Sequence, residues 1–524
     1  MAHGSDQTPE TSAAEKEEYD AYVGRIARGA GISSAGQGIG RVLGYATQVA
    51  LARFFGPAQL GFYAIGVTVV QLANVLSQFG MDNGVVRYVA HYRAVGDHAR
   101  VRGTVLLVLG VAFALSVALS VLLFAGAGLL AEGVFGKPFL ESTFRAFSPA
   151  VPFFTLMSTA LFATQGFQTV KYATYVEHVV RPLVNLGLVV VFYLLGVQIL
   201  GAVAAYAVSM AAGSVLALYY LGRLVPGLAD PKAPAKFETG EVLGASGPMM
   251  VAKVTGYANS WAMVWVLGVF APAREVGIYN AASRTAALSG LVLLAFSGIF
   301  SPMVSSLYRS GSLDHLGSLY EDVSRWTFTG SLAIFLPTAF LARDVLAVFG
   351  GEFVAGWLAM VVIAAGYLFG SSVGLTARVL VMTGNEKKVM WAKIGATIAT
   401  IAGGAAMAPV FGIMGAAVAT ATGIVLVNAL TVFLVRRLLG VWPYNRHYLK
   451  PLAAGLLAAG GALLLRWALP LPDGLAAIVV LGPTFLTLFA ALIVALGLSD
   501  SDRQFLRAFW TAVRRNIGIG RAGA

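Results

Sequence analysis

The sequence lacks cysteine and has few charged residues. None of its 524 residues is cysteine, which excludes disulfides, zinc–thiolate sites and cysteine nucleophiles. Charged residues make up 11% of the chain and hydrophobic residues 58%, whereas about 25% of the residues in a soluble domain are charged. The mean hydropathy is +0.78. This composition indicates an integral membrane protein, and the lack of alternating ten-residue runs argues against a β-barrel.

Long apolar segments fill most of the chain. A membrane-spanning helix needs about 20 mostly apolar residues, and this rule predicts an all-α polytopic protein with fourteen spans. The expected segments are residues 30–52, 58–80, 103–131, 143–167, 176–196, 200–222, 243–269, 276–300, 323–342, 354–382, 390–411, 413–435, 448–470 and 474–498. The polar, acidic residues 1–24 predict a disordered cytoplasmic tail. The loops leave no room for a soluble domain.

The basic residues predict the orientation of the chain. Loops after even-numbered segments hold fourteen Lys and Arg, against four after odd-numbered segments, which places both termini in the cytoplasm. The net charge of +12 fits loops that face anionic lipid better than it fits nucleic-acid binding. Near the end, Phe505, Phe509 and Val513 share one helical face, so residues 499–524 predict an amphipathic cytoplasmic tail at the membrane surface. A soluble amphipathic tail is the alternative.

Four short stretches of the first half of the chain have similar counterparts in the second half, in the same order. "RVLGYATQ" (41–48) is echoed by "KVTGYANS" (253–260), and "GPAQLGFY" (56–63) by "APAREVGIY" (271–279). The other two echoes pair residues 91–97 with 307–314 and residues 196–204 with 412–419. The order predicts two six-helix lobes, 25–222 and 243–436, joined by a cytoplasmic loop at 223–242 and followed by two added helices within 437–498. Parallel repeats of this kind are related by pseudo-two-fold symmetry around a central cavity, as in transporters.

Several cations lie inside the predicted spans, where a charge is costly unless it faces protein or water. Arg41, Lys253 and Arg284 lie deepest, and Arg181, Arg378 and Lys393 lie nearer the ends. Polar residues at helical spacing extend the same faces and predict a cavity lining. This lining consists of Gln37, Tyr45, Gln48, Asn74, Gln78, Tyr257, Ser260 and Asn280.

Acids are almost absent from the same segments. Glu177 begins the fifth segment and Asp82 lies just past the second. Because buried cations need anions, this imbalance predicts that the partner of the cations is an anionic substrate such as phosphate or pyrophosphate. The alternatives are structural: Arg41 and Lys253 bonded to backbone carbonyls, and the cations near the segment ends reaching the interface along their side chains.

Two further pairs of residues each allow two alternative roles. Asp82 and Arg87 are expected to pair with each other or with a neighbouring helix, with a functional role as the lesser alternative. Glu177 and His178 form either a proton-sensing pair or a helix-end network. The prolines of "SPAVPFF" (148–154) predict a break in the fourth segment. No cluster of His, Asp and Glu has the spacing of metal ligands, so neither a metal nor a cofactor is expected.

The stretch 49–97, from "VALARFFGPAQLGFY" to "VAHYRAVGD", resembles the start of Wzx-type polysaccharide-export flippases. These belong to the multidrug/oligosaccharidyl-lipid/polysaccharide (MOP) superfamily. "VFGGEFVAGWLAMVVIAAGYLF" (348–369) and "VLVMTGNEKKVMWAKI" (379–394) are similar to the second half of the same family. The resemblance covers most of the first twelve segments and rests on many weak positions.

The resemblance implies a MATE/MOP-like fold. It also implies a flippase that moves a polyprenyl-(pyro)phosphate-linked oligosaccharide to the outer leaflet for cell-surface polysaccharide synthesis. Its partners would be that lipid-linked substrate, the bilayer, and the polymerase and glycosyltransferases of the same pathway, with no nucleic acid. In such proteins cavity arginines are thought to hold the (pyro)phosphate, a role that Arg41, Lys253 and Arg284 match by helix and depth. An acid-based sodium site of related flippases is in doubt, because segments seven to twelve hold no Asp or Glu.

Three other classes compete with this reading. A cation-exporting multidrug transporter of the same superfamily needs acids in its interior, and here the interior offers Arg and Lys. A polyprenyl-linked glycosyltransferase or polymerase needs carboxylates or metal ligands on sizeable loops, and these loops are short and poor in acids. A non-transporting scaffold leaves the duplicated polar faces unexplained.

Overall fold

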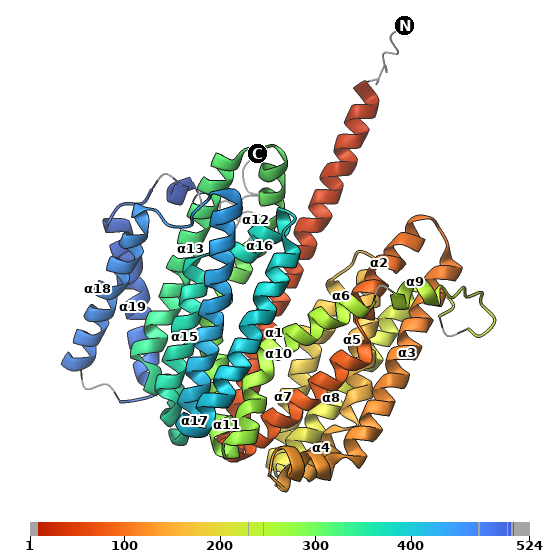
Figure 1. Cartoon of the computed structure of the whole chain (residues 1–524), viewed down its shortest axis with the longest axis horizontal. Helices are drawn as coiled ribbons and strands as arrows, with labels where there is room; N and C mark the ends of the chain where they lie inside the picture. Colours follow the sequence, from red (N-terminus) through yellow and green to blue (C-terminus); the bar gives the residue numbers. More distant parts are fainter. Residues whose placement is uncertain are drawn as a thin grey trace, which may run out of the picture. The chain divides into compact units, whose positions relative to one another are not determined.

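The computed structural model describes residues 9–228, 230–244, 246–469, 472–499, 501–504 and 507. Helices account for nearly all of these residues, and no strand occurs within the described ranges (Figure 1). The chain forms two compact units, Met1–Gly277 and Ile278–Ala524. Each unit has its own core.

The first unit consists of helices of very different lengths. They are α1 (Pro9–Gln78), α2 (Met81–Ala94), α3 (His98–Ala125), η1 (Leu129–Val134), α4 (Phe139–Phe147), α5 (Ala150–Gln165), α6 (Lys171–Tyr175), η2 (Val176–Val180), α7 (Arg181–Leu194), α8 (Ile199–Leu224), α9 (Thr239–Gly244), α10 (Ser246–Phe270) and α11 (Ala273–Ala286). Helix α11 crosses the boundary between the units. The turns η1 and η2 are π-helical.

Helix α1 contains two of the predicted spans. Its φ/ψ angles leave the helical region at Gly56 (φ 75°, ψ 177°), in the short gap between the expected segments 30–52 and 58–80. Glycine adopts this conformation without a Cβ clash, and Pro57 follows at once, where it has no N–H to lose. At its other end α1 begins at Pro9, so residues 9–24 are helical where the sequence predicted a disordered tail. Glutamate and alanine, both good helix formers, are the most frequent residues of that stretch.

The core of the first unit lies among α3, α5 and α8, which run side by side (Figure 1). Three rings from different helices meet there: Tyr63 of α1, Phe147 of α4 and Tyr206 of α8, with centroids 5.5 to 6.4 Å apart. The predicted proline break is confirmed, because α4 and α5 meet at an angle of 41° around Ser148 and Pro149. The bend lets one predicted span turn around this aromatic cluster.

Helix α11 packs against α1 at a reciprocal glycine contact. A Cβ on Gly61 would lie 1.8 Å from the carbonyl oxygen of Ala273, and one on Gly277 would lie 1.9 Å from that of Pro57. These residues belong to the echoed stretches 56–63 and 271–279, so the two copies contact each other through equivalent positions. Nearby, the Nζ of Lys137 donates to the carbonyl oxygens of Phe135 and Gly268, and burial lowers the pKa of this ammonium.

The second unit begins within α11. Its elements are η3 (Ala287–Gly290), α12 (Leu291–Arg309), α13 (Leu313–Phe340), α14 (Ala342–Ala347), η4 (Gly351–Gly356), α15 (Trp357–Ser372), α16 (Thr376–Met382), α17 (Glu386–Leu439), η5 (Arg446–Tyr448), α18 (Leu449–Ala468) and α19 (Leu475–Ala495). Helix α17 repeats the arrangement of α1, because it joins the expected segments 390–411 and 413–435 across a break at Gly412. The expected segment 354–382 is divided between α15 and α16.

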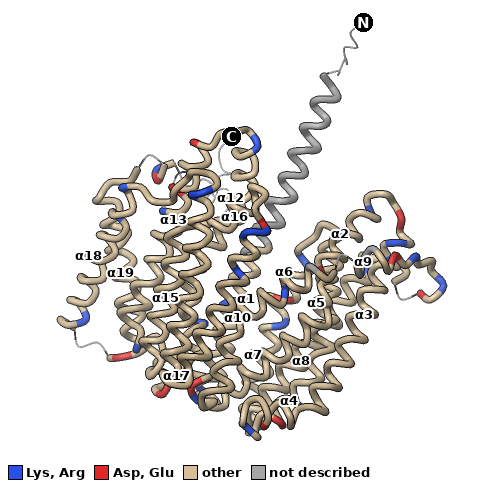
Figure 2. Tube along the Cα trace, in the orientation of Figure 1, with Lys and Arg blue, Asp and Glu red and all other residues tan. Residues whose placement is uncertain are grey.

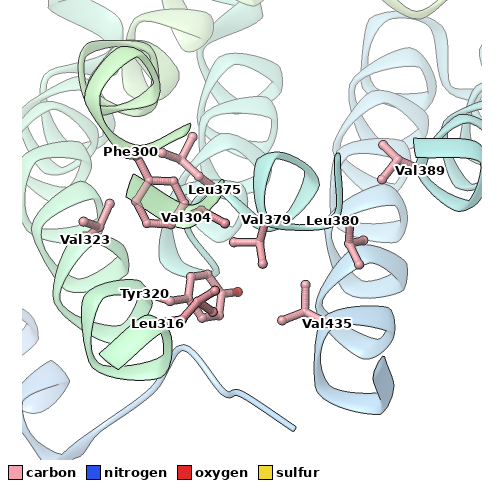
Figure 3. Packing of buried hydrophobic residues seen from close by; sticks show 10 residues of the cluster. All are labelled: Phe300, Val304, Leu316, Tyr320, Val323, Leu375, Val379, Leu380, Val389 and Val435. Atoms are coloured by element: carbon pink, nitrogen blue, oxygen red, sulfur yellow. The ribbon is translucent and has the colours of Figure 1, made fainter. Parts of the chain in front are cut away.

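Apolar side chains from α12, α13, α16 and α17 form one core of this unit (Figure 3). Phe300, Val304 and Leu316 surround the ring of Tyr320, which is fully buried. The Tyr320 hydroxyl donates to the carbonyl oxygen of Val373, at the break between α15 and α16, over 2.8 Å. A buried hydroxyl needs such a partner, and this bond fixes the break against α13.

Helices α18 and α19, the two added helices of the sequence analysis, pack on α13 and α14. Leu332 of α13 contacts α18 at Gly455, where a Cβ would lie 2.9 Å from the leucine side chain. At the end of α18, Arg466 donates to the buried Asp344 over 2.6 Å and to Asp473 over 2.9 Å. The ion pair compensates both charges and fastens the added helices to the unit.

The chain after α19 returns to α13. Asp502 accepts hydrogen bonds from the Arg325 guanidinium (2.9 Å) and from Trp326 Nε1 (2.8 Å). Burial raises the pKa of Asp502, but the hydrogen bonds from Trp326 and Ser499 and the Arg325 charge outweigh it and hold this pKa below its usual value. The predicted amphipathic helix of the tail lies mostly outside the described residues.

The helices fit a multi-pass membrane protein. In the described ranges, nine helices are long and apolar enough to cross a membrane, or ten if the bent pair α4–α5 counts as one span. Helices occupy all fourteen predicted segments, and the count of fourteen spans stays a prediction. Charges gather at loops and helix ends, while the middles of α3, α8 and α15 carry none (Figure 2).

We expect the change Gly61→Ala to destabilise the first unit. The new methyl group would overlap the Ala273 carbonyl, and overpacking of this kind costs about 1–3 kcal/mol. Melting of the purified protein in detergent measures the effect. Gly44→Ala in the same helix is the matched control, because a Cβ there meets nothing within 4 Å. Equal melting temperatures for the two variants would contradict the close contact.

Candidate functional site

Close packing brings α1 against η2. A Cβ on Gly36 would lie 2.0 Å from the side chain of Thr174, and one on Gly40 would lie 2.7 Å from the carbonyl oxygen of His178. Glycines four residues apart allow helix backbones to approach in this way in membranes. The contact places Arg41, the next residue of α1, beside the turn that carries Glu177 and His178.

Four charged or titratable groups gather at this contact, and we call them the α1–η2 cluster: Arg41, Glu177, His178 and Arg181. The charges of Glu177, Arg181 and Arg41 all act on the His178 ring. Arg41 is exposed and Arg181 is half-buried. The Nε atom of Arg181 is buried and has no hydrogen-bond partner among the described residues. The cluster therefore holds two guanidinium groups against one carboxylate.

Lys253 forms a second charged group, in α10. Its Nζ makes an ion pair with Asp82 of α2 and lies 4.8 Å from the centroid of the Phe162 ring of α5. The Asp82 side chain is 0% exposed and that of Lys253 is 31% exposed. Lys253 therefore has a counter-ion within the protein itself, a partner that the sequence analysis did not foresee. Asp82 thus pairs with a neighbouring helix and not with Arg87, which is exposed beside the Tyr88 ring.

Lys253 also lines an open pocket of about 500 Å³. The predicted lining residues Tyr257 and Ser260 follow it along α10, and Gln71 of α1 and Asn83 of α2 complete the polar part. Apolar surface comes from Val75, Met249, Ala252 and Trp261. A pocket with one cation, several amides and hydroxyls and an aromatic ring suits an amphipathic anion.

Tyr257 fixes the pocket wall. Its hydroxyl donates to the carbonyl oxygen of Thr68 in α1 (2.8 Å) and accepts from Trp265 Nε1 (2.7 Å). Both partners would lose a hydrogen bond without the hydroxyl. This arrangement holds the Lys253 side of α10 in register with α1.

The other predicted lining residues of the first unit are not among those that line this pocket. The amide of Gln78 donates to Ser158 Oγ of α5 (2.7 Å), and this hydroxyl lies 3.2 Å from Asn74 Oδ1. Both amides are buried. Gln37 is exposed and donates to Ser33 (3.0 Å). The remaining predicted residues on α1 are Tyr45, which is half-buried, and Gln48, which is buried.

The second unit holds the other predicted cations. Arg284 of α11 is half-buried, and its Nε donates to Oδ1 of the buried Asn280 over 3.1 Å. Arg378 of α16 and Lys393 of α17 are exposed. The six predicted cations are therefore divided between the units, with Arg41, Arg181 and Lys253 in the first.

Sequence reasoning missed three functional or structural partners. It did not pair Asp82, just past the end of one span, with Lys253, which it placed deep within another. It also left out Arg325 and Arg466, which lie inside predicted segments and are compensated by Asp502 and Asp344. The signal was present in the acids just beyond the segment ends. Within the described ranges, no group of three or more His, Asp or Glu is close enough to hold a metal ion.

Comparisons with known sequences place the chain among glycan-related proteins. The family described as polysaccharide biosynthesis protein matches residues 26–308. Stage V sporulation protein B of Bacillus subtilis is 28% identical over 184 residues, and the probable low-salt glycan biosynthesis flippase Agl15 of Haloferax volcanii is 25% identical over 219 residues. These matches cover 34% and 41% of this chain. The chain spans only 35% and 45% of the length of the two relatives.

Solved structures share the fold. The lipid II flippase MurJ in an inward closed conformation has a TM-score of 0.70 at 15% identity, covering 88% of this chain and 98% of that one. An inward-facing multidrug resistance MATE family transporter of the MOP superfamily has a TM-score of 0.64 at 15% identity, covering 76% and 94%. The predicted MATE/MOP-like fold is thereby confirmed.

The change Tyr257→Phe tests the pocket wall. We expect it to lower the stability of the protein by about 1–3 kcal/mol, because the Thr68 carbonyl and the Trp265 N–H both lose a partner. Thermal melting in detergent measures the loss. Tyr219→Phe is the control, since that side chain is 53% exposed, and an equal shift in both variants would contradict the assignment.

Proposed function

The chain belongs to the polysaccharide biosynthesis protein family, and from this premise we propose that it is a flippase for a lipid-linked glycan. In this proposal the substrate is a polyprenyl-(pyro)phosphate-linked oligosaccharide that moves from the cytoplasmic to the outer leaflet of the inner membrane. The protein works by alternating access, with both termini in the cytoplasm. The product serves cell-surface polysaccharide synthesis, and polymerase and glycosyltransferases of the same pathway act with it.

The excess of cations in the α1–η2 cluster carries the proposal. The cluster contains two guanidinium groups, Arg41 and Arg181, and one carboxylate, Glu177. The buried Nε of Arg181 lacks a hydrogen-bond partner among the described residues. A buried donor without a partner costs free energy. A phosphate oxygen supplies both the acceptor and the missing negative charge, and guanidinium groups bind phosphate with two parallel hydrogen bonds.

Lys253, Arg284, Arg378 and Lys393 have further roles in this proposal. Lys253 faces a pocket with room for a phosphate and adjoining polar groups. Arg284, Arg378 and Lys393 offer cations on the second unit, so that each unit can hold the anion at one stage of transport. Such sharing keeps the charge of the anion compensated in both states of the transporter, which a charge inside a membrane requires.

The alternative is a multidrug exporter of the same superfamily, and the likeness to a MATE transporter in fold is what supports it. A carrier of cationic drugs needs a free acid in its cavity. Asp82, a fully buried acid beside the described pocket, is compensated by Lys253. The charge of the site therefore favours an anionic substrate.

The experiment that tests the function is export of surface glycan by cells that carry Arg41→Ala or Arg181→Ala in place of the wild type. We expect export to fall tenfold or more, since a charge-assisted hydrogen bond contributes about 1.5–3 kcal/mol and about 1.4 kcal/mol corresponds to tenfold. Arg145→Ala is the control, because Arg145 is half exposed on α4, where it pairs with Glu141 one turn away and lies over the Phe124 ring. Wild-type export by both variants, at wild-type abundance, would overturn the proposal. A loss of tolerance to cationic dyes with intact export would identify a drug exporter instead.

A second prediction concerns the driving force. An anionic headgroup that moves outward across an inside-negative membrane gains about 2.3 kcal/mol per charge per 100 mV. We expect transport in proteoliposomes to accelerate when such a potential is imposed with potassium and valinomycin. Transport that ignores the potential and requires a sodium or proton gradient would rule out this source of energy.

A further inference from the structure

Asp82 lies in an unusual position for a carboxylate. It belongs to the first turn of α2, and its side chain is 0% exposed. Apart from the Lys253 ammonium, no donor among the described residues is paired with either of its oxygens. The cation that compensates it is Lys253 of α10. If Lys253 is withdrawn, a negative charge remains in a site that water does not reach, which is strongly unfavourable.

Lys253 both pairs with Asp82 and lines the pocket. Its side chain is 31% exposed and lines the pocket beside Tyr257 and Gln71, while its ammonium also faces the Phe162 ring at 4.8 Å. A ligand in the pocket can therefore reach the same ammonium that Asp82 holds. The carboxylate oxygens of Asp82 and the phosphate oxygens of a ligand would compete for the Lys253 ammonium, a single point charge on a flexible side chain.

The backbone holds Asp82 in place. The two residues that separate α1 from α2 near it, Phe79 (φ 48°) and Gly80 (φ 73°), both have positive φ. A Cβ on Gly80 would lie 2.4 Å from the carbonyl oxygen of Ser246 and 2.7 Å from the nitrogen of Met250, so the turn is pressed against α10. A non-glycine residue with positive φ persists only where its surroundings impose it, and such residues concentrate at functional sites. The turn keeps the carboxylate next to Lys253 whatever the pocket contains.

We propose that Asp82 is a built-in competitor for the anionic group of the substrate. It occupies Lys253 while the pocket is empty, and the phosphate of a lipid-linked ligand must displace it in order to bind. When the ligand leaves, the uncompensated buried carboxylate draws Lys253 back. This inference rests on the proposed function and assigns Asp82 the role of a positioning residue that limits affinity and so promotes release.

The proposal predicts different effects of Asp82 on charged and on uncharged ligands. Asp82 weakens binding of a lipid phosphate, which needs the Lys253 ammonium, and has no effect on a lipid alcohol of the same chain, which does not. A purely structural role of the Asp82–Lys253 pair would change the binding of both lipids alike. Farnesyl phosphate and farnesol form such a matched pair of probes.

Calorimetric titration of the full-length protein in detergent with the two lipids tests this. We expect Asp82→Asn to bind farnesyl phosphate about tenfold more tightly than the wild type and farnesol equally well. In the Lys253→Gln background the same change should have no effect on either lipid, because the competition is gone. Such a double-mutant cycle isolates the coupling between the two residues.

The double variant Asp82→Lys/Lys253→Asp, in which the two residues are exchanged, is the control for misfolding. It keeps an ion pair between α2 and α10, and we expect it to fold while losing the preference for farnesyl phosphate over farnesol. In cells, Asp82→Asn should slow glycan export, since release becomes limiting.

The outcomes separate this inference from the proposed function. If the wild type binds farnesyl phosphate no better than farnesol, recognition of an anion fails and the proposed function fails with it. If the wild type prefers the phosphate but Asp82→Asn leaves its affinity unchanged or lowers it, the competitor role alone is overturned. An Asp82→Asn effect that persists in the Lys253→Gln background overturns it equally.

Discussion

Hydrocarbon does not solvate charge, and this constraint governs where ionisable side chains lie in the protein. A charge within a membrane costs several kcal/mol unless a counter-ion, protein dipoles or water compensate it. The pairs Lys253–Asp82, Arg466–Asp344 and Arg325–Asp502 each meet the requirement inside one unit. Each pair also joins two helices, so the electrostatic requirement becomes a packing contact. Arg181 departs from the pattern, because no ion pair joins it to an acid within the described ranges and its buried Nε has no hydrogen-bond acceptor there. In the proposed function, this is where the ligand binds.

Glycine contacts set the distances on which these charges depend. Gly36 and Gly40 let α1 approach η2 closely enough for Arg41 to act on His178. Gly61 and Gly277 bring the two echoed stretches together through equivalent carbonyls. A side chain at any of these positions would separate the helices. Small residues thus contribute to the candidate site without touching a ligand.

A flippase must bind its substrate and then lose it, and the two charged groups of the first unit divide that task in the proposed mechanism. The α1–η2 cluster offers guanidinium groups in excess of acid, which favours capture of a phosphate. Lys253 carries its own counter-ion, Asp82, which makes binding there reversible. Tyr257 couples this site to α1 through the Thr68 carbonyl. Binding at the pocket and the packing of α10 are therefore linked.

The sequence by itself determined the membrane class, the helical segments and the proline break before α5, because these depend on local hydropathy and residue type. The reciprocal glycine contact also joins two stretches, 56–63 and 271–279, that the sequence repeat had already identified as equivalent. Only the tertiary structure decided which charges meet. Asp82 and Lys253 are 171 residues apart in the chain, and their pairing depends on the turn at Gly80 and on the packing of α10. Local pattern places a charge along its own helix, whereas the partner of that charge is set by contacts between distant helices.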